Sequence, residues 1–449
     1  MNKICITECR TSGGDWTATI QGAIDQMFLL GGGEVTIPAG DYEIGSIRLR
    51  SGVTLHLLED AHLIASRDPE VYAYVAETDI EPVAAEDCTD AIWEPVHIRK
   101  SFDFMNKPMS RWNRAVIKAV DATNVAIIGE AGSWIDGRDC YDEMGEERYR
   151  GPHAINMHRC ENILLKGYQI RNSSNWAHAL FDCKNIRAEG VTVLAGHDAI
   201  HITSCTNVVI QNCDFQTGDD CVAGIDNLNV EVSHCKMNTA CSGMRFGGTN
   251  VVAHDCLFYG PSNYRFRGAL TLEQKKEGAS CTNASGQGDP MLSAYTYYAD
   301  FSRQIRGVPG NIVIYDCEFR RTDRFLHYNF SGNEPWQRNK PLDNVVFRNI
   351  KADSIRLPLT FWGDTSQKGN LRLENIQVRF ADGADRAFLY LGNYDKVTLK
   401  DVTVENLHGS YLIRKWTEDG TIQLENCTCP GFDGAMEELA DTPFVCQAF

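Results

Sequence analysis

The sequence has 449 residues with 43 basic and 60 acidic side chains, which gives a net charge of −17 at pH 7. This charge argues against nucleic acid or an anionic membrane as the partner, because both bind basic surfaces, but a local cluster of arginines could still bind an acidic sugar. No apolar run approaches the roughly 18 residues of a membrane span. The first residues lack the apolar centre of a signal peptide, so we expect a cytoplasmic protein.

The first predicted element is an amphipathic helix over residues 15–30. Asp15 is a suitable N-cap, and Gly31-Gly32-Gly33 ends the pattern. The apolar residues follow the i, i+3, i+4, i+7, i+8 spacing of a helix with one buried face, at Ile20, Ala23, Ile24, Met27 and Phe28. We expect this helix to cover the open end of a stack of strands, where core and unpaired backbone would otherwise be exposed.

Short strands follow the helix. Alternating apolar and polar runs, separated by Pro, Gly and Ser, predict strands at residues 34–37, 40–44, 47–49 and 53–57. Residues 67–112 break this rhythm with tryptophans and several acids, and we interpret them as an inserted loop. The strand pattern resumes at Val116, 125–128 and Asn162-Ile163.

A short pattern then returns every 21 or 22 residues. An asparagine followed by an apolar residue opens each repeat, at Asn185-Ile186, Asn207-Val208, Asn229-Val230 and Asn250-Val251. A period near 22 residues with β-branched alternation and no helical stretch is typical of one coil of a parallel β-helix. We therefore predict an all-β solenoid that forms a single domain over residues 1–449, with roughly ten or more coils.

In such a solenoid, residues one period apart become stacked neighbours about 4.8 Å apart. This spacing predicts two apolar columns, one of Ile200, Val222 and Met244 and one of Cys213, Cys235 and Cys256. It predicts two polar columns, one of Asp198, Asp220 and Ser242 and one of His197, Asp219 and Cys241. A fifth, mixed column contains His201, Ala223, Arg245 and Arg267. Three carboxylates would thus meet on two adjacent coils. Like charges placed opposite one another destabilise a sheet. Because the aspartates cost stability, we infer that they have a function and take this cluster as the candidate site.

The 17 cysteines are an odd number in a long chain, and several occupy equivalent positions of successive coils. We interpret them as small buried side chains of an inner ladder rather than disulfides or metal ligands. Cys427 and Cys429 lack a second ligand pair, so we predict no zinc site there.

A second interruption is predicted over residues 269–310, which are rich in Gly, Ser, Lys and Tyr. The coil pattern returns at Asn311-Ile312, Asn344-Val345, 371–373, 397–399 and 422–424. Long loops on a rigid solenoid often carry binding surfaces. The two insertions could therefore form the walls of a cleft, or a lid over one end of the core.

Several stretches together resemble glycoside hydrolase family 28, the polygalacturonase family, whose members are right-handed parallel β-helices. The resemblance runs from about Asp15 to Asn349, and the stretches that are specific when taken together are 15–25, 31–42, 49–57, Ile135-Asp136-Gly137 and 172–178. It implies a right-handed solenoid and a glycosidase.

The family's catalytic motifs are partly altered in this chain. Gly-Asp-Asp is intact at Gly218-Asp219-Asp220, whereas Asn-Thr-Asp falls on Gly196-His197-Asp198 and keeps only the aspartate. Gly-His-Gly falls on Cys241-Ser242-Gly243, where serine replaces histidine, and Arg-Ile-Lys is similar to Arg265-Phe266-Arg267. The resemblance therefore implies a divergent active site.

By resemblance Asp219 is the general acid, and Asp198 and Asp220 hold the attacking water. Glycoside hydrolysis needs such a pair of functions, and crowded carboxyls cannot all ionise easily, so at least one pKa should be raised. The resemblance implies inversion of the anomeric centre, although neighbours on adjacent coils would lie nearer the 5 to 5.5 Å typical of retaining enzymes.

Other side chains of the cluster have two interpretations each. His197 or His201 could replace the missing histidine, or both could only hydrogen-bond at coil corners. Arg245, Arg265 and Arg267 could bind a uronate, or could only neutralise the aspartates. Trp176 could stack on a sugar, or could be packing.

The sequence favours a glycosidase that trims imported, pectin-derived acidic oligosaccharides from the chain end, without a metal or cofactor. One alternative is a β-helical polysaccharide lyase, in which clustered aspartates hold Ca²⁺ and an arginine acts as base. Another is a catalytically silent carbohydrate-binding solenoid, which the missing histidine favours and the intact Gly218-Asp219-Asp220 opposes. The oligomeric state is not determined by the sequence.

Overall fold

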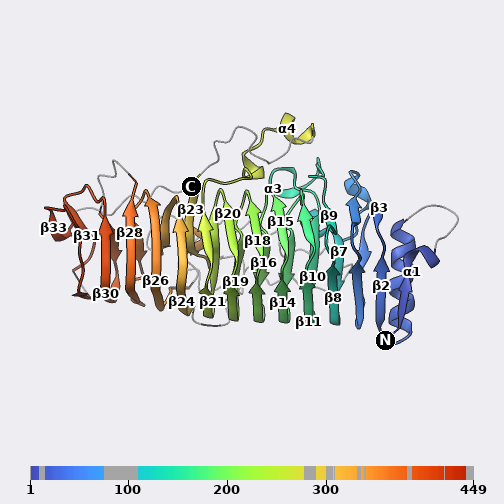
Figure 1. Cartoon of the computed structure of the whole chain (residues 1–449), viewed down its shortest axis with the longest axis horizontal. Coiled ribbons are helices and arrows are strands. Elements are labelled where there is room, and N and C mark those ends of the chain that lie inside the picture. The colour runs from blue at the N-terminus through green and yellow to red at the C-terminus, as the bar shows by residue number, and fades with distance from the viewer. Residues whose placement is uncertain are drawn as a thin grey trace.

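The 22-residue repeat forms one coil of strands in the computed structural model of the chain. Ile186 pairs with Val208, and Val208 pairs with Val230, each in parallel register one period apart. Parallel strand pairs from coil to coil build a right-handed parallel β-helix, which Figure 1 shows as a long stack with the N-terminal coils at one end. The predicted fold class is confirmed.

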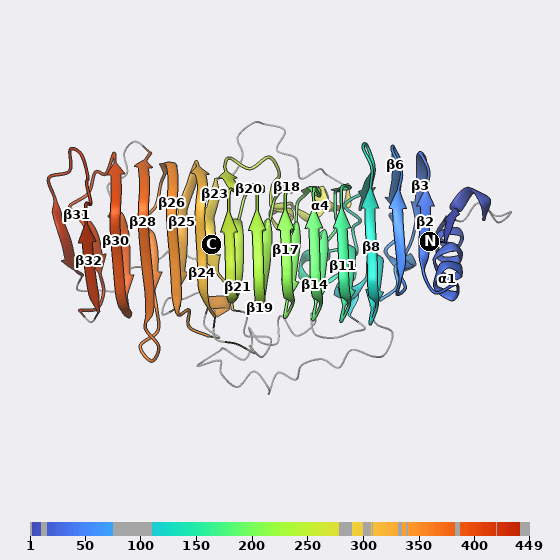
Figure 2. The same ribbon diagram turned by 60° about the horizontal axis from the view of Figure 1, so that its bottom comes forward.

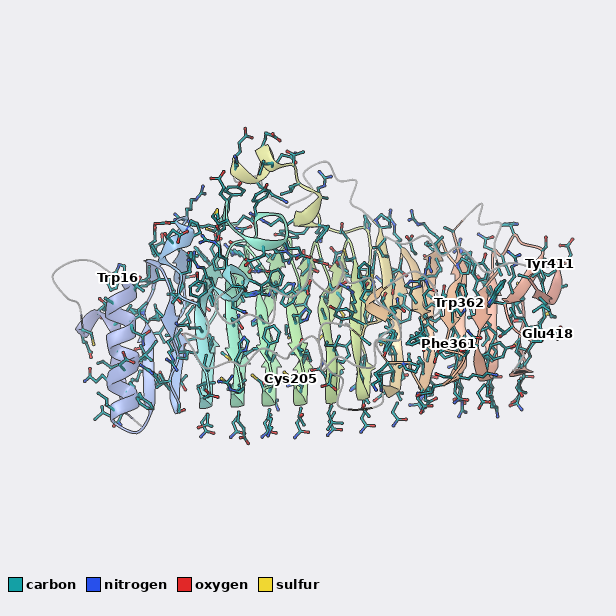
Figure 3. The ribbon with its side chains drawn as sticks, turned by 180° about the vertical axis from the view of Figure 1, so that it is seen from behind. Trp16, Cys205, Phe361, Trp362, Tyr411 and Glu418 are labelled. Atoms are coloured by element: carbon teal, nitrogen blue, oxygen red, sulfur yellow. The ribbon has the colours of Figure 1, made fainter. Side chains whose placement is uncertain are left out.

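The structure describes residues 2–9, 16–74, 110–277, 290–299, 307, 309–330, 335–337, 340–381, 387–418 and 420–440. Within these ranges, no helix is long and apolar enough to cross a membrane. Figure 3 shows Trp16 near one end of the stack and Tyr411 near the other.

Each coil contributes to three parallel sheets, one on each face of the stack. The first sheet, seen as a row of arrows in Figure 2, contains β1 (Lys3–Cys5), β2 (Gly33–Ile37), β5 (Val53–Leu57), β8 (Thr123–Gly129), β11 (Glu161–Lys166), β14 (Lys184–Glu189), β17 (Thr206–Gln211), the later parts of β19 (Val222–Ser233) and β21 (Ser242–His254), the first parts of β24 (Gly310–Arg320), β26 (Asn344–Ile355), β28 (Gly369–Phe380) and β30 (Tyr394–Glu405), and β32 (Thr421–Glu425).

The second sheet contains β3 (Gly40–Ile44), β6 (Ala61–Ala65), β9 (Trp134–Asp136), β12 (Gln169–Arg171), β15 (Thr192–Ala195), β18 (Asp214–Thr217), β20 (Lys236–Thr239), β22 (Leu257–Tyr259) and the later parts of β24, β26, β28 and β30. The third sheet contains β4 (Ile47–Arg48), β7 (Ala115–Val120), β10 (His153–His158), β13 (His178–Phe181), β16 (Ile200–Thr203), the first parts of β19 and β21, β23 (Met291–Tyr297), β25 (Thr322–Asn329), β27 (Leu359–Trp362), β29 (Leu389–Gly392), β31 (Tyr411–Lys415) and β33 (Ala435–Leu439). The candidate aspartates lie where strands of this third sheet begin.

The core consists of columns of side chains that point into the coils. Ile200, Val222 and Met244 are register partners and are buried, as predicted. The predicted column of Cys213, Cys235 and Cys256 is also buried. Every cysteine in the described part of the chain has a free thiol. The thiols therefore act as small core side chains that can also hydrogen-bond to backbone carbonyls.

A ladder of asparagines marks one corner of the coils. The side-chain amide of each asparagine donates to the side-chain oxygen of the one before, for example from Asn207 to Asn185 at 3.0 Å and from Asn229 to Asn207 at 3.1 Å. These residues have positive φ, 57° at Asn207, a region that asparagine tolerates better than most residues. The repeated asparagine is thus explained by backbone geometry together with its amide ladder.

The predicted capping helix is α1 (Trp16–Leu29), and it contacts β1 to β5 of the first coils. Ile20, Ala23, Ile24 and Met27 are buried as predicted, but Phe28 is 43% exposed, because it falls at the edge of the apolar stripe. The helix ends at two glycines with positive φ, Gly31 and Gly32, and the predicted N-cap Asp15 lies outside the described residues.

The two predicted insertions differ from expectation in part. Of residues 67–112, the described parts include η2 (Pro69–Val71) and η5 (Arg111–Asn113), and residues 75–109 lie outside the described ranges. The second interruption, 269–310, is not wholly a loop, because Met291–Tyr297 forms β23 of the third sheet. Tyr295 and Tyr297 alternate along this strand, and both side chains are buried in the core. The composition of the whole segment predicts a loop, which is why these tyrosines are interpreted as part of one from the sequence.

Short helices stand beside the coils that carry the aspartates. They are α3 (Glu146–Tyr149), η6 (Arg267–Ala269), α4 (Leu272–Lys276) and η7 (Pro335–Gln337), the last of which places Trp336 against Arg245. The remaining short helix, η1 (Ile6–Glu8), contacts α1 in the N-terminal part of the stack. Figure 1 shows α3 and α4 at the upper edge of the central coils.

Candidate active site

Three aspartates from two adjacent coils form the centre of the site. Asp198 lies two residues before β16, and Asp220 lies two residues before β19, with Asp219 next to it. Because Ile200 pairs with Val222, Asp198 stacks beside Asp220, and the amide of Ala199 donates to the carbonyl of Asp220 at 3.0 Å. One carboxylate oxygen from each of the three aspartates lies within 4.8 Å of the other two. The predicted cluster is confirmed as a geometric unit.

The three carboxyls differ in burial. Their side chains are 4% exposed at Asp198, 13% at Asp219 and 1% at Asp220. Burial, followed by the charges of Asp219 and Asp220, raises the pKa of Asp198 well above its usual range. Burial also raises the pKa of Asp220 to about 7, although the Arg245 guanidinium opposes that shift. The site can therefore hold a proton near neutral pH, as expected for crowded carboxyls.

Gly218 is required by a close approach of the chain. A Cβ at this position would lie 1.9 Å from the carbonyl oxygen of Arg265, so any side chain would displace that segment. The same segment is tied to the preceding coil, because the amide of Arg267 donates to the carbonyl of Gly196 at 3.0 Å. The glycine of the Gly-Asp-Asp motif thus lets a later segment cross beside the aspartates.

Backbone groups hold the aspartates in place. The carbonyl of Asp219 accepts hydrogen bonds from the hydroxyls of Thr217, at 2.7 Å, and of Thr239. The amide of Ser242 donates to Oδ1 of Asp220 at 2.9 Å. The Ser242 hydroxyl instead lies 3.2 Å from that of Thr296 on β23. Ser242 therefore contributes its backbone to the cluster, and its hydroxyl belongs to a buried hydroxyl pair.

His201 is the histidine that contacts the aspartates. Its Nδ1 lies 2.9 Å from Oδ2 of Asp198. Its ring stacks on Trp176 with centroids 3.6 Å apart and planes at 7°. The edge of Trp176 in turn meets Trp112 at 4.9 Å, and Trp176 is only 6% exposed. His201 therefore covers one face of Trp176, which favours packing, the second interpretation of this tryptophan.

His197 lies beside the aspartates but faces a separate cavity. The cavity is about 220 Å³ and is lined by Glu147, Arg150, His197, Phe266, Arg267, Gly268 and Lys275. His197 is 1% exposed, and neither ring nitrogen makes a hydrogen bond within the described part of the chain. Burial, followed by the positive charges of Arg150, Arg267 and Lys275, lowers its pKa well below the usual value. His197 is therefore a neutral ring with free nitrogens in a basic cavity.

The three predicted arginines have different surroundings. Arg245 lies 3.4 Å from Asp220 and is stacked by Tyr298 and Trp336, at 4.2 and 5.3 Å from their ring centroids. Its register partners are Ala223 and Thr296. Arg265 has an exposed side chain.

Arg267 does not continue the column of His201 and Arg245, which was a wrong prediction. The intervening chain leaves the coil in η6, and β23 supplies the next member of the column instead. The Arg267 side chain is 2% exposed and forms a 2.6 Å ion pair with Asp139, whose carbonyl also accepts a hydrogen bond from it at 2.7 Å. Arg267 is therefore mainly a structural ion-pair partner of Asp139, rather than a free group that could bind a uronate.

Sequence reasoning missed Arg150, which is the cation beside Asp219. Its guanidinium lies 3.7 Å from Asp219, 2.7 Å from Glu147 and 3.2 Å from Asn175. Arg150 follows α3 in an irregular segment between β9 and β10, where no period predicts its neighbours. Lys275 of α4 reaches the same cavity from a second irregular segment. No periodic signal could have found either residue.

The chain matches the model of glycosyl hydrolases family 28 over residues 83–249, which include all three aspartates. A probable polygalacturonase from Vitis vinifera is 28% identical over 220 residues, which cover 46% of this chain and 40% of the grapevine protein. The chain therefore aligns with less than half the length of this relative.

Two solved structures share the fold. An exopolygalacturonase from Thermotoga maritima matches with a TM-score of 0.58 at 16% identity, over 96% of this chain and 92% of that chain. A family 28 exopolygalacturonase from Yersinia enterocolitica matches with a TM-score of 0.60 at 16% identity, over 95% of this chain and 78% of that chain. At these identities the likeness establishes the architecture alone.

Proposed function

Because the chain is a relative of glycoside hydrolase family 28, we propose that it is a glycoside hydrolase that cleaves O-glycosidic bonds of uronate-containing oligosaccharides. The observation that carries the proposal is the cluster of Asp198, Asp219 and Asp220, whose carboxylate oxygens lie within 4.8 Å of one another. Cleavage requires a carboxylic acid that protonates the departing oxygen and a carboxylate that activates water. A set of three, with two raised pKa values, can supply both functions.

In the proposed mechanism Asp219, the most exposed of the three side chains, donates the proton to the leaving oxygen. Asp198 and Asp220 orient a water molecule that attacks the anomeric carbon and take up its proton. His201 holds Asp198 through its 2.9 Å contact, and the Ser242 amide holds Asp220. Attack by water from the face opposite the leaving group would invert the anomeric centre, as the family resemblance implies.

The basic cavity supports an acidic substrate. Arg150 connects the aspartates to this cavity, since it lies 3.7 Å from Asp219 and also lines the cavity with Lys275. Lysine and arginine form strong charge-assisted hydrogen bonds with carboxylates. A uronate residue bound at the aspartates could therefore place its carboxylate among these cations. We propose pectin-derived oligogalacturonides as the substrate and cleavage from the chain end.

The direct test is a hydrolysis screen of the purified protein on oligogalacturonides, rhamnogalacturonan fragments and neutral aryl glycosides. Mass analysis of the products identifies the bond that is cleaved, and a time course separates release of single units from internal cleavage. We expect release of a single uronate-bearing unit. Binding without cleavage of any substrate would instead favour a silent carbohydrate-binding solenoid.

A lyase remains a second candidate, because three carboxylates within 4.8 Å could also hold a cation. A lyase would form a new double bond that absorbs ultraviolet light, and its activity would depend on added Ca²⁺. We expect hydrolysis to continue in excess chelator, with no increase in absorbance. Inhibition by chelator that Ca²⁺ reverses would place the lyase first.

A further inference from the structure

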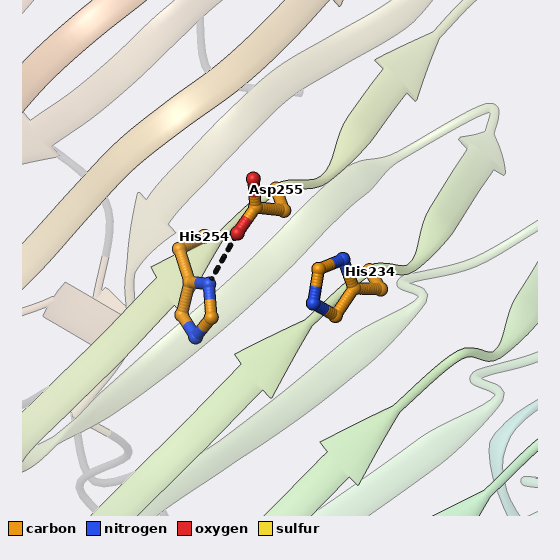
Figure 4. A group of neighbouring side chains, drawn as sticks. All are labelled: His234, His254 and Asp255. Atoms are coloured by element: carbon orange, nitrogen blue, oxygen red, sulfur yellow. Dashed lines mark hydrogen bonds and ion pairs between the residues drawn. The ribbon is translucent and has the colours of Figure 1, made fainter.

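Two histidines and an aspartate lie together at the end of strands of the first sheet, whereas the three aspartates lie where strands of the third sheet begin. His254 ends β21, the strand that begins at Ser242, and Asp255 follows it; His234 follows β19 on the preceding coil. One nitrogen from each histidine and one carboxylate oxygen of Asp255 all lie within 4.8 Å of one another. Figure 4 shows the three side chains converging, with a 2.7 Å contact from His254 Nδ1 to Asp255.

The surroundings of His254 hold its ring in position. Nε2 lies 3.5 Å from Glu231, on the side of the ring opposite Nδ1. The ring also stacks on Tyr315 of the next coil, with centroids 5.0 Å apart and planes at 8°. A carboxylate on the second ring nitrogen is the usual arrangement around a metal-binding histidine, because it fixes the tautomer and the ring orientation.

The backbone brings these groups together through the repeat. Ser233 pairs with His254 in the register of β19 and β21, so His234 and Asp255 occupy the same corner of adjacent coils. Both have positive φ, 54° and 53°. Asparagine fills this corner elsewhere, at Asn212, Asn349 and Asn375. The histidine is therefore not required by the corner, and asparagine is a compatible replacement for either residue.

We propose that His234, His254 and Asp255 bind one divalent transition-metal ion of the Zn²⁺ class. Two imidazoles and a carboxylate suit Zn²⁺, whereas Ca²⁺ and Mg²⁺ prefer oxygen ligands. Bonds of about 2.1 Å in tetrahedral geometry would bring the ligand atoms to roughly 3.4 Å apart. The ligand atoms now lie within 4.8 Å of one another, so they would draw closer on binding, and water would complete the shell.

The bound ion would join two adjacent coils on one face. The ligands come from both coils, and Tyr315 of the next coil supports His254. An ion that binds only the folded chain raises its stability with the logarithm of the free ion concentration relative to Kd. Its role would thus be structural, and hydrolysis at the aspartates would continue without it.

The test is calorimetric titration of the metal-stripped full chain with Zn²⁺, in parallel with Ca²⁺ and Mg²⁺. We expect one zinc site per chain, no comparable site for the other two ions, and a rise in melting temperature with Zn²⁺. His234→Asn and Asp255→Asn should weaken zinc binding at least 10-fold, and Glu231→Gln about 10-fold, the lower end of the effect of removing an outer carboxylate. Both asparagine variants should fold, because asparagine occupies the equivalent corners.

His62→Ala is the matched control. His62 also lies 2.7 Å from an aspartate, Asp41, and also stacks on an aromatic ring, Trp134, but it belongs to neither cluster of potential ligands found in the described residues. Its replacement should leave zinc binding unchanged.

Substitution of Co²⁺ for Zn²⁺ tests whether cysteine is the ligand instead. The absorption spectrum should lack the intense near-ultraviolet charge-transfer band of cobalt bound to thiolate. The proposal would be overturned by that band, by zinc binding that both asparagine variants retain, or by binding only at millimolar zinc.

Discussion

At the scale of single residues, the main question is which aspartate carries the proton that the leaving oxygen receives. The resemblance assigns the acid to Asp219, but the carboxyls whose pKa values rise are Asp198 and Asp220. The three interact strongly, so protons belong to the cluster rather than to one residue. The side chain of Asp219 is the most exposed and the one beside Arg150. A proton held between Asp198 and Asp220 in the free protein is compatible with donation from Asp219 once the substrate displaces water.

Asp219→Asn tests the assignment of the acid. We expect a loss of 10² to 10⁴-fold in kcat on natural glycosides, the range for a positioned acid. The loss should be much smaller for aryl glycosides whose leaving group needs no proton. Asp214→Asn, on the same coil, is the control and should retain activity. If Asp220→Asn rather than Asp219→Asn spares the activated substrates, the two roles must be exchanged.

The pH dependence of activity should follow the raised pKa of Asp220. If Asp220 must be ionised to activate water, the acidic limb of kcat/KM should have an apparent pKa near 7 rather than near 4. The pH profile of the wild-type chain, measured on an activated substrate so that the acid is not limiting, checks this expectation. A plateau that extends down to pH 5 would show that Asp220 ionises more easily in the working site.

Stability should change with pH in the opposite sense. The folded pKa of Asp220 lies above its unfolded value of 3.8, so its contribution is fully present below about pH 4 and is lost as the pH rises through about 7. Asp220→Asn should therefore stabilise the fold at pH 8 relative to wild type, by on the order of a few kcal/mol at most. Denaturant unfolding at pH 5 and pH 8 measures the difference.

At the scale of elements, the asparagine ladder gives the corner of each coil its geometry. The side chain of Asn207 makes one hydrogen bond to each neighbouring coil, and its backbone has φ 57°. Asn207→Ala should lower the free energy of unfolding by about 2 kcal/mol, because it loses both hydrogen bonds and adds left-handed strain. Asn207→Gly loses only the hydrogen bonds and should cost about 1 kcal/mol. Equal stability of the two variants would show that backbone strain is not the constraint.

The helix α4 is the element that we expect to select acidic sugars. Lys275 is 4% exposed and lines the cavity, whereas Lys276 next to it lies 3.9 Å from Glu143 and is half-exposed. Lys275→Met keeps the aliphatic stem but removes the charge. It should raise KM for a uronate substrate by about 10 to 100-fold, as expected for a lost charge-assisted hydrogen bond, and should leave KM for a neutral glycoside unchanged.

Lys276→Met is the control for this experiment and should change neither value. Equal increases of KM for acidic and neutral sugars in Lys275→Met would mean that the lysine supports the fold of the cavity. In that case the uronate specificity should be abandoned, while hydrolysis at the aspartates would stay as proposed.

At the scale of the whole molecule, the coils supply a rigid frame and the irregular segments supply most of the positive charge near the site. The net charge of −17 contrasts with the local group of Arg150, Arg267 and Lys275. An acidic substrate would thus be attracted to this cavity in spite of the negative net charge. The cytoplasmic location stays a prediction, which fractionation of the producing cells would test.

The sequence by itself determined the coils and the aspartate cluster. In a solenoid each residue stacks on the one that is one period away, so Asp198 beside Asp220, and Ile200 beside Val222, follow from spacing alone. Tertiary structure decided the rest, because irregular segments have no period. Arg267 meets Asp139 across 128 positions, Arg150 reaches Asp219 from between two coils, and His201 covers the face of Trp176. Such contacts depend on where an insertion folds back, which only the packing of the complete chain fixes.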